Sequence, residues 1–264
     1  MAAKDNTLHL LFDGDMIVFR TCSAAETPIN WYGDLWTLHS DLAEVKEAID
    51  NMVYSIADKV LRHYKHEGAF DITMMFSSAP YFRAKVYPLY KLNRIGKRKP
   101  IGYPAAVEWV RENYNSMSVP NLEADDLLGI YGSMPNFKSV VISGDKDMRS
   151  FPCHFYNFIQ DEYYETTPEQ ADYWFYYQTL IGDITDNYKG CPRIGEIGAK
   201  KILDKDCSWS AVVAAFEKAG LSEEDALVQA RLARILRFED VNEEFEPVLW
   251  TPKGSEKEQK SKGA

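Results

Sequence analysis

Three short apolar runs, separated by stretches of helical periodicity, constrain the fold of this chain more than any other feature. Each run is followed by polar residues or glycine and has the length of a buried parallel strand. The runs lie at 8–12, 72–76 and 139–142, and apolar residues recur at helical spacing at 41–66, 105–114 and 123–131. This alternation predicts an α/β fold whose central, mostly parallel sheet is flanked by helices.

The second part of the chain is predicted to be helical. Thr167, Pro168 and Gln170 form a strong helix start, with a capping hydroxyl, a proline at the first helical position and a glutamine at the third. Further helices are expected at 174–181, 199–203, 210–219 and 222–238. The last residues are rich in lysine and glutamate, which is typical of disorder. We therefore expect an α/β core at 1–165, a helical region at 166–250 and a disordered tail at 251–264.

Length and composition indicate an ordinary globular protein. With 264 residues, of which 45% are hydrophobic, the chain can bury a full core. No run approaches the roughly 20 apolar residues that cross a bilayer, and the N-terminal residues do not resemble a signal peptide. We expect a cytoplasmic protein that does not bind membranes. The four cysteines are scattered without a CxxC pair, and we expect free thiols.

The charge is distributed unevenly along the chain. A net charge of -10 argues at first sight against a nucleic-acid partner. However, residues 83–99 contain seven lysines and arginines and no acid. The acids instead gather in short clusters, and a bound divalent cation would reverse the sign of such a pocket. The basic stretch and the acidic clusters therefore have separate roles.

Four acidic clusters stand where α/β enzymes place their chemistry, after strands or at helix starts. Any one of them alone is more often a turn or a helix cap. Together they suggest a metal centre, because adjacent carboxylates on a packed element repel one another unless a cation intervenes. Oxygen ligands without His or Cys suit Mg²⁺ or Mn²⁺, and eight carboxylates suffice for two ions about 3.5 to 4 Å apart. The clusters are Asp13; Glu123, Asp125 and Asp126; Asp145 and Asp147; and Asp183 and Asp186.

A glycine-rich stretch, 190–203, follows the last acidic cluster. Its small residues predict a tight loop between two helices, with backbone N–H groups exposed at a helix start and Lys200 and Lys201 beside them. Such a loop binds the phosphate backbone without reading base sequence.

The order of these motifs resembles the structure-specific 5′ nuclease family, which contains 5′-3′ exonucleases and flap endonucleases. The likeness runs from about residue 8 to residue 203 and is strongest to the 5′-3′ exonuclease of short-tailed phages. Five motifs carry it: Leu11-Phe12-Asp13-Gly14, Tyr90-Lys91-Leu92-Asn93-Arg94, Glu123-Ala124-Asp125-Asp126, Ser143-Gly144-Asp145-Lys146-Asp147, and the stretch from Gly182-Asp183 to Leu203.

The resemblance implies a PIN-like fold with a helical arch at about 83–115 and a helix–three-turn–helix motif at about 174–204. It also implies two Mg²⁺ ions, replaceable by Mn²⁺, and suggests a K⁺ ion at the helix–three-turn–helix. Asp13, Glu123, Asp125 and Asp126 would hold the first Mg²⁺, and Asp145, Asp147, Asp183 and Asp186 the second. Lys91 and Arg94 would contact the scissile phosphate. The remaining DNA contacts would come from Arg83, Tyr90, Lys97, Arg98, Lys99, Gly195, Gly198, Lys200 and Lys201.

The activity implied by the resemblance is that of a divalent-metal-dependent 5′-3′ exodeoxyribonuclease, with flap endonuclease and RNase H-type activity as extensions. Its partner would be DNA with a free 5′ end, duplex or flap, or an RNA/DNA hybrid, and the protein would act as a monomer. The implied role is phage DNA replication, degradation or primer removal.

One position departs from the family pattern. The family has an Asp after the second strand, where this chain offers only serines, and Ser78 takes that place. A hydroxyl is a weaker metal ligand than a carboxylate, so the first metal would bind less tightly or rely on Asp15. A turn or helix-cap role for Asp15 is an equal alternative.

Two rival functions remain open from the sequence. One is a DNA-binding protein on the nuclease scaffold, catalytically weakened by the serine at position 78. The other is a haloacid-dehalogenase-type phosphatase that uses Asp13 as nucleophile and Asp15 as acid. The second leaves the glycine-rich loop and the Tyr90–Arg94 motif without a role.

Overall fold

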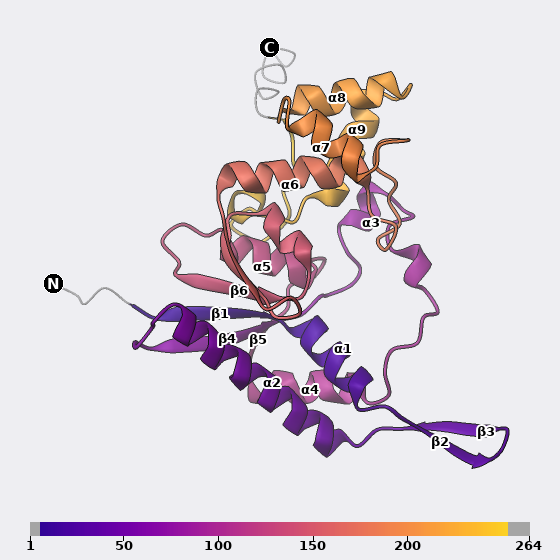
Figure 1. Ribbon diagram of the computed structural model, residues 1–264, viewed down its shortest axis with the longest axis vertical. Helices are drawn as coiled ribbons and strands as arrows, with labels where there is room; N and C mark the ends of the chain where they lie inside the picture. The colour runs from indigo at the N-terminus through magenta and orange to yellow at the C-terminus, as the bar shows by residue number, and fades with distance from the viewer. Residues whose placement is uncertain (1–5, 253–264) are drawn as a thin grey trace.

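The computed structural model describes residues 6–252, and in these a six-stranded sheet forms the centre of the molecule (Figure 1). Its order is β5-β4-β1-β6-β7-β8, and every neighbouring pair is parallel except β7 and β8. The predicted mostly parallel sheet is confirmed. The strands are β1 (Leu8–Asp13), β4 (Phe70–Met75), β5 (Asn115–Met117), β6 (Ser139–Ser143), β7 (Cys153–Asn157) and β8 (Glu162–Thr166).

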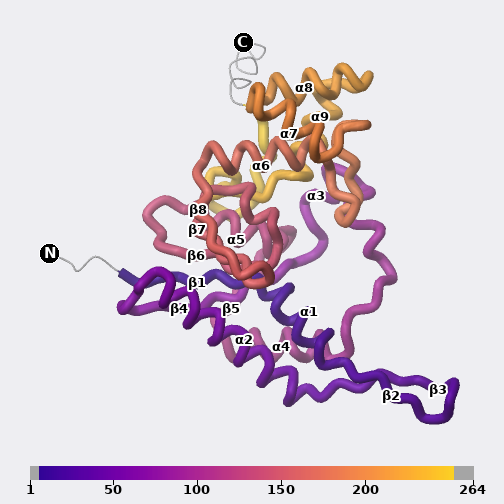
Figure 2. Tube along the Cα trace, in the orientation of Figure 1, coloured from indigo at the N-terminus to yellow at the C-terminus, as the bar shows by residue number. Residues whose placement is uncertain are grey.

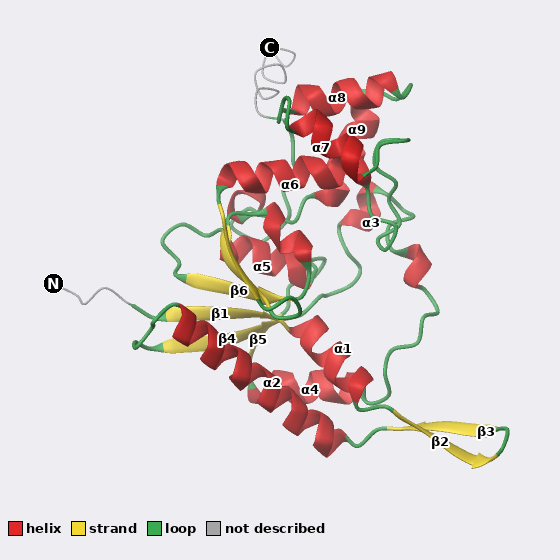
Figure 3. Ribbon diagram, viewed as in Figure 1, coloured by secondary structure: helices red, strands yellow, loops and turns green. Residues whose placement is uncertain are grey.

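Helices cover both faces of this sheet, and alternate strand residues supply the two cores (Figure 3). Leu10 and Phe12 of β1 pack with α1, α2 and α4, whereas Leu11 packs with α5 on the opposite face. Because side chains alternate along a strand, one apolar run can feed both layers. The helices are α1 (Gly14–Ala24), α2 (Leu42–His63), α4 (Tyr103–Asn113) and α5 (Ala124–Gly132).

The C-terminal helices pack over η2 (Lys146–Ser150), with clusters of their own around Phe216 and Phe175. The predicted cap of the first helix is confirmed, since the Thr167 side chain accepts a hydrogen bond from the Gln170 N–H. The last helix ends at Ala233 rather than at Phe238, because Arg234 is extended and buries its side chain. These helices are α6 (Pro168–Ile181), α7 (Glu196–Leu203), α8 (Trp209–Lys218) and α9 (Glu223–Ala233).

The segment expected to form a helical arch, about 83–115, is helical only in part. It contains the four-residue α3 (Arg83–Val86) and the short 3₁₀ turn η1 (Leu92–Arg94), and then runs without helix to residue 102 (Figure 2). Glycines at 96 and 102 adopt positive φ, and prolines at 88 and 100 remove backbone donors. The only long helix in the range, α4, packs on the sheet as part of the core. The part of this range before α4 therefore lacks a long helix of the kind expected in an arch.

A two-stranded hairpin, β2 (Thr27–Tyr32) and β3 (Leu35–His39), projects from the body between α1 and α2 (Figure 1). The sequence reading missed it because its residues are exposed on both faces and carry no alternating pattern.

Three smaller expectations can be compared with the structure. Within residues 6–252, none of the helices combines the length and apolar character that crossing a membrane demands. The four cysteines are free thiols, as predicted. The predicted disordered tail, 251–264, lies outside the described residues except for its first two positions.

Gly129→Ala is expected to destabilise the protein by about 2 kcal/mol or more through overpacking. A Cβ at Gly129 on α5 would lie 2.3 Å from the Leu236 carbonyl oxygen, which is backbone and cannot move cheaply. Gly198→Ala on α7 is the matched control, because its nearest neighbour would be 3.6 Å away. It should gain up to about 1 kcal/mol from helix propensity. Urea unfolding measures both, and equal effects would contradict the close approach of α5 to the C-terminal segment.

Candidate active site

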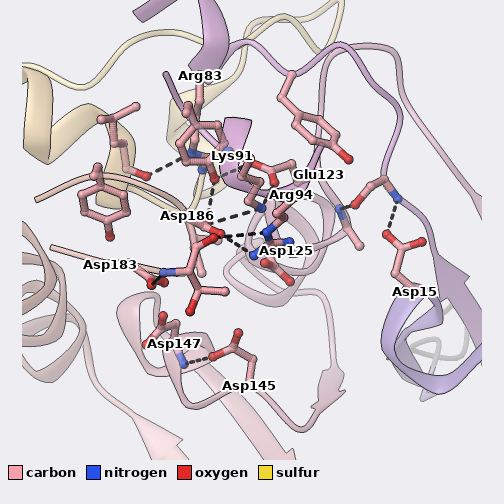
Figure 4. A pocket seen from close by; sticks show the side chains of 18 of the residues that line it. Asp15, Arg83, Lys91, Arg94, Glu123, Asp125, Asp145, Asp147, Asp183 and Asp186 are labelled. Atoms are coloured by element: carbon pink, nitrogen blue, oxygen red, sulfur yellow. Dashed lines mark hydrogen bonds and ion pairs between the residues drawn. The ribbon is translucent and has the colours of Figure 1, made fainter. Parts of the chain in front are cut away.

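The four acidic clusters meet in one open cavity of about 1360 Å³ at the carboxyl ends of β1 and β6 (Figure 4). The helical region and the 83–102 connection supply the opposite wall. Segments more than 150 residues apart in sequence therefore share one site. Of the predicted site residues, the lining contains Asp13, Arg83, Tyr90, Lys91, Arg94, Lys97, Arg98, Lys99, Glu123, Asp125, Asp145, Asp147, Asp183, Asp186 and Gly195.

Asp13 ends β1, and two hydrogen bonds fix its side chain. Its Oδ1 accepts a hydrogen bond from the Met16 N–H at 2.9 Å, which caps α1, and its Oδ2 accepts one from the Ser143 hydroxyl at 2.8 Å. The helix cap and the active-site position are thus properties of the same side chain. Ser143 ends β6, so the contact also joins the ends of the two central strands.

Asp145 and Asp147 follow β6 and begin η2. The Asp145 Oδ1 accepts a hydrogen bond from the Asp147 N–H at 2.8 Å. The Asp147 Oδ1 is buried without a hydrogen-bond partner among the described residues. A buried, unpartnered carboxylate oxygen is costly unless a cation or another donor reaches it.

Asp183 and Asp186 lie on a loop closed by two backbone hydrogen bonds between Asp183 and Tyr188. Gly182 and Gly190 pack against each other beneath this loop so closely that a Cβ on Gly182 would lie 2.4 Å from the Gly190 nitrogen. The glycines noticed in the sequence therefore build the base of the loop. Its tip faces the cavity (Figure 4).

The cations of the Tyr90–Arg94 motif are directed at these acids. The Lys91 ammonium donates to Glu123 Oε1 and lies 3.4 Å from Asp186 Oδ2. Arg94 pairs with Asp186 Oδ1. The backbone joins the same elements, since the Lys91 N–H donates to the Asp186 carbonyl at 2.9 Å. Lys91 adopts a left-handed φ of 55°, which turns the chain at this point.

Burial and like charge shift the pKa values of the acids upward. Burial, then the nearby Asp15 and Asp145, raises the pKa of Asp13 to about 6. Burial, then Asp145, raises the pKa of Asp147 to about 7. Burial also raises the pKa of Asp125 well above its usual value, with Asp13 and Asp145 adding to the effect.

Glu123 differs from the other acids in the cavity. Burial alone would raise its pKa, but Arg83 and Lys91 together lower it. Glu123 therefore stays ionised beside Arg83 and Lys91, whereas the other acids of the cavity face mainly negative charge.

Comparison with known proteins identifies the family. A model of the 5′-3′ exonuclease N-terminal resolvase-like domain matches residues 8–170, more than half of the chain. The chain belongs to the 5′-3′ exonuclease family. The resemblance seen in the motifs is confirmed, and the protein is a nuclease that acts on DNA.

Two curated relatives match this nuclease over nearly their whole length. It is 30% identical to the exodeoxyribonuclease of Enterobacteria phage T3, over 92% of this chain and 93% of that protein. The exonuclease of Escherichia phage T7 matches with the same identity and the same coverage.

Solved structures share the fold. The flap endonuclease of bacteriophage T5, in a complex with DNA and metal ions, matches with a TM-score of 0.62 and 15% identity over 86% of this nuclease and 89% of that chain. A second structure of the phage T5 protein, co-crystallised with metal ions, matches with a TM-score of 0.61 at 15% identity over the same shares of both chains.

The donor set of the nuclease fits a hard divalent cation. The acids that line the cavity offer only carboxylate oxygens, and one of these, Asp147 Oδ1, lacks a partner. Within residues 6–252, no three His, Cys, Asp or Glu side chains form a ready-made cage for an ion. Two expected ligands, Glu123 and Asp186, are instead paired with lysine and arginine.

Asp126 does not belong with the other expected metal ligands. It is 0% exposed, does not line the cavity, and its two oxygens accept from Arg83, from the Glu123 N–H and from the Leu236 N–H. Four donors occupy the carboxylate fully. The prediction that Asp126 is a metal ligand is wrong in this structure, because adjacent helical residues point in different directions.

Two predicted DNA contacts are also corrected. Arg83 is 3% exposed and Tyr90 is 6% exposed, so neither side chain is free to meet DNA. The guanidinium of Arg83 is held by carboxylates and carbonyls, and the Tyr90 ring packs with Phe175 and Tyr188. By contrast, Gly195 at the N-cap of α7 and Lys200 and Lys201 in its last turn are exposed, and their role in DNA binding stays a prediction.

Sequence reasoning left Asp15 open, and the structure places it in the cavity wall. Its Oδ2 accepts from the Ser77 N–H at 2.9 Å and its Oδ1 from the Tyr103 hydroxyl at 3.1 Å. Ser77 lines the cavity, but Ser78 does not. No sequence signal identified Ser77 or Tyr103, because their contacts depend on how α1, β4 and α4 pack.

Asp147→Asn is expected to stabilise the nuclease in chelator at pH 8 by on the order of 2 kcal/mol. Because the pKa of this carboxyl rises from 3.8 to about 7 on folding, stability is lost progressively as pH rises from about 4 to about 7, and the amide removes this loss. The gain should shrink at pH 5, where the folded carboxyl is already protonated. Urea unfolding at both pH values measures the difference, with Asp58→Asn on the exposed face of α2 as control. A gain independent of pH would contradict the repulsion account.

Proposed function

We propose that this nuclease is a divalent-metal-dependent 5′-3′ exodeoxyribonuclease that hydrolyses phosphodiesters at or near the 5′ ends of duplex DNA. The observation that carries this proposal is the convergence of acids from four chain segments with Lys91 and Arg94 in one cavity. Metal-assisted phosphodiester cleavage requires carboxylates that hold the metal ions and basic side chains that hold the phosphate.

The residues divide into two cation sites. Asp13, Glu123 and Asp125 would hold one Mg²⁺, and Asp145, Asp147, Asp183 and Asp186 the second, with Mn²⁺ as a substitute. When bound, the ions would activate water and offset the charge that develops on the phosphate.

The basic side chains act on the DNA itself. Lys91 and Arg94 bind the scissile phosphate, exchanging their carboxylate partners for phosphate oxygens and so orienting the bond for attack. Lys97, Arg98 and Lys99 are exposed at the rim of the cavity, where they would hold the strand that enters it. The loop at Gly195 and Gly198, with Lys200 and Lys201 and a K⁺ ion, would hold the duplex backbone.

The family model, that of a 5′-3′ exonuclease, supports the polarity, and the relatives support the substrate. Those from phages T3 and T7 are an exodeoxyribonuclease and an exonuclease, and the phage T5 flap endonuclease binds DNA. We further propose that the nuclease is a monomer and acts in the host cytoplasm during phage DNA replication, degradation or primer removal. DNA flaps and RNA/DNA hybrids would be further substrates.

The two rival functions are not favoured. A phosphatase acid at Asp15 would need a free carboxyl, whereas both of its oxygens accept hydrogen bonds. A scaffold that had lost catalysis would have no use for several buried acids with raised pKa values, whose repulsion destabilises the fold.

Cleavage of a 5′-labelled duplex in Mg²⁺ tests the proposal. The wild type should release the 5′ label, and Asp145→Asn should lower the rate by about 100-fold or more, as expected when a group that stabilises transition-state charge is lost. Asp58→Asn, an exposed acid outside the cavity, should leave the rate unchanged. Release of label only from 3′ ends would refute the polarity, and binding without cutting would make the protein a DNA-binding module.

Replacing Lys200 and Lys201 by alanine tests the exposed loop. If both contact backbone phosphates, binding should weaken equally for all sequences, and the slope of log affinity against log salt should fall by about 2. Fluorescence anisotropy of a labelled duplex over a salt series measures both quantities. An unchanged slope would exclude phosphate contacts by these lysines.

A further inference from the structure

Arg83 is the most completely engaged side chain in the described site. Its Nη1 donates to Glu123 Oε2 and to Asp126 Oδ2, each at 2.7 Å, and its Nη2 donates to Asp126 Oδ1 at 2.7 Å. Nη2 also donates to the Arg234 carbonyl at 2.5 Å, and Nε to the Leu232 carbonyl at 3.1 Å. The guanidinium thus joins the N-cap and first turn of α5 to the last turn of α9 and the residue after it.

The segment 232–237, which contains the last two residues of α9 and the non-helical residues after it, is called the C-terminal strap below. It is held against the start of α5 by a second contact, because the Leu236 N–H donates to Asp126 Oδ1 at 3.2 Å. Asp240 Oδ2 accepts from Arg234 Nε at 2.7 Å and from the Arg237 N–H at 2.9 Å, which fixes the middle and the far end of the strap. The strap therefore cannot shift without moving Asp126 and Arg83 together.

The consequence for Glu123 is a fixed orientation. Its Oε2 accepts from Arg83 and, at 3.0 Å, from the Tyr90 hydroxyl, whereas its Oε1 accepts from the Lys91 ammonium. Two donors on one oxygen prevent rotation of the carboxylate and leave the other oxygen facing the cavity. A buried arginine pair adds little net stability compared with apolar packing, so stability alone does not account for it.

We propose that Arg83 is a positioning residue, which holds Glu123 in the orientation needed for cation binding and is itself held by the C-terminal strap. This rests on the proposed function, since Glu123 is taken there as a cation ligand. Arg83 acts through Glu123 and does not touch the DNA. Partners that orient a metal ligand commonly contribute 10–100-fold to affinity or activity.

The test compares Arg83→Gln and Arg83→Lys with Val53→Ala. Val53 is the control for lost stability: it is 0% exposed in the core that α2 forms with the sheet, and it neither lines the cavity nor belongs to the strap. Arg83→Gln leaves buried partners without a donor and Val53→Ala leaves a cavity, so both variants should lose stability. Only Arg83 should affect the chemistry.

The expected result has two readouts, taken well below the melting temperature of each variant. Arg83→Gln should lower kcat on the 5′-labelled duplex and Mn²⁺ affinity by calorimetry, each by about 10-fold or more, with KM for DNA changed less than about threefold. Arg83→Lys should recover part of both. Val53→Ala should retain kcat and Mn²⁺ affinity despite its lower melting temperature.

Several outcomes would overturn the inference. Equal behaviour of Arg83→Gln and Val53→Ala would make Arg83 purely structural, and a raised KM with normal kcat would make it a DNA contact. If Arg83→Gln does not fold, Tyr90→Phe removes one hydroxyl from the same Glu123 oxygen, and unchanged Mn²⁺ affinity and kcat there would refute the fixed orientation. An inactive wild type would instead refute the proposed function, while the Mn²⁺ comparison would still test the placement of Glu123.

Discussion

The gathering of carboxylates at the ends of parallel strands is the constraint to which the rest of this structure responds. Asp13, Asp125 and Asp147 share one cavity, and their pKa values rise first because burial disfavours the charged carboxylate and then because neighbouring acids, Asp145 among them in each case, repel it. Such a cluster is unfavourable in an isolated fold. Bound cations would make it favourable, so the repulsion among these carboxylates explains both the instability of the site and its capacity to bind metal.

The basic residues divide into those that belong to the fold and those left for the substrate. Arg83 is enclosed by Glu123, Asp126 and the C-terminal strap, whereas Lys97 and Lys99 remain exposed at the cavity rim. Lys91 lies between these extremes, half-buried on Glu123. A basic stretch that looks uniform in sequence thus contains a buried structural arginine, a lysine among the acids of the cavity and exposed cations at its rim.

Much of the fold and most of the site could be predicted because they depend on local patterns. Apolar runs gave β1, β4 and β6, and the capping box at Thr167 gave the start of α6. The acids of the cavity follow strands or begin helices, so their position was implied by strand order. The long helix expected before α4 is absent because glycine and proline between residues 88 and 102 outweigh the basic, helix-like composition of that segment. The β2–β3 hairpin was not predicted because its residues are exposed on both faces and therefore show no alternation of apolar and polar side chains.

The sequence by itself determined the α/β class, the family and which segments carry acids and cations, since these follow from side-chain periodicity and motif order. Only the tertiary structure decided which acids face the cavity. Asp125 and Asp126 are neighbours, yet one lines the cavity and the other is enclosed by Arg83 and the Leu236 N–H. The reason is that a helix turns successive side chains about its axis, and their partners come from a strap more than a hundred residues away, which no local pattern encodes.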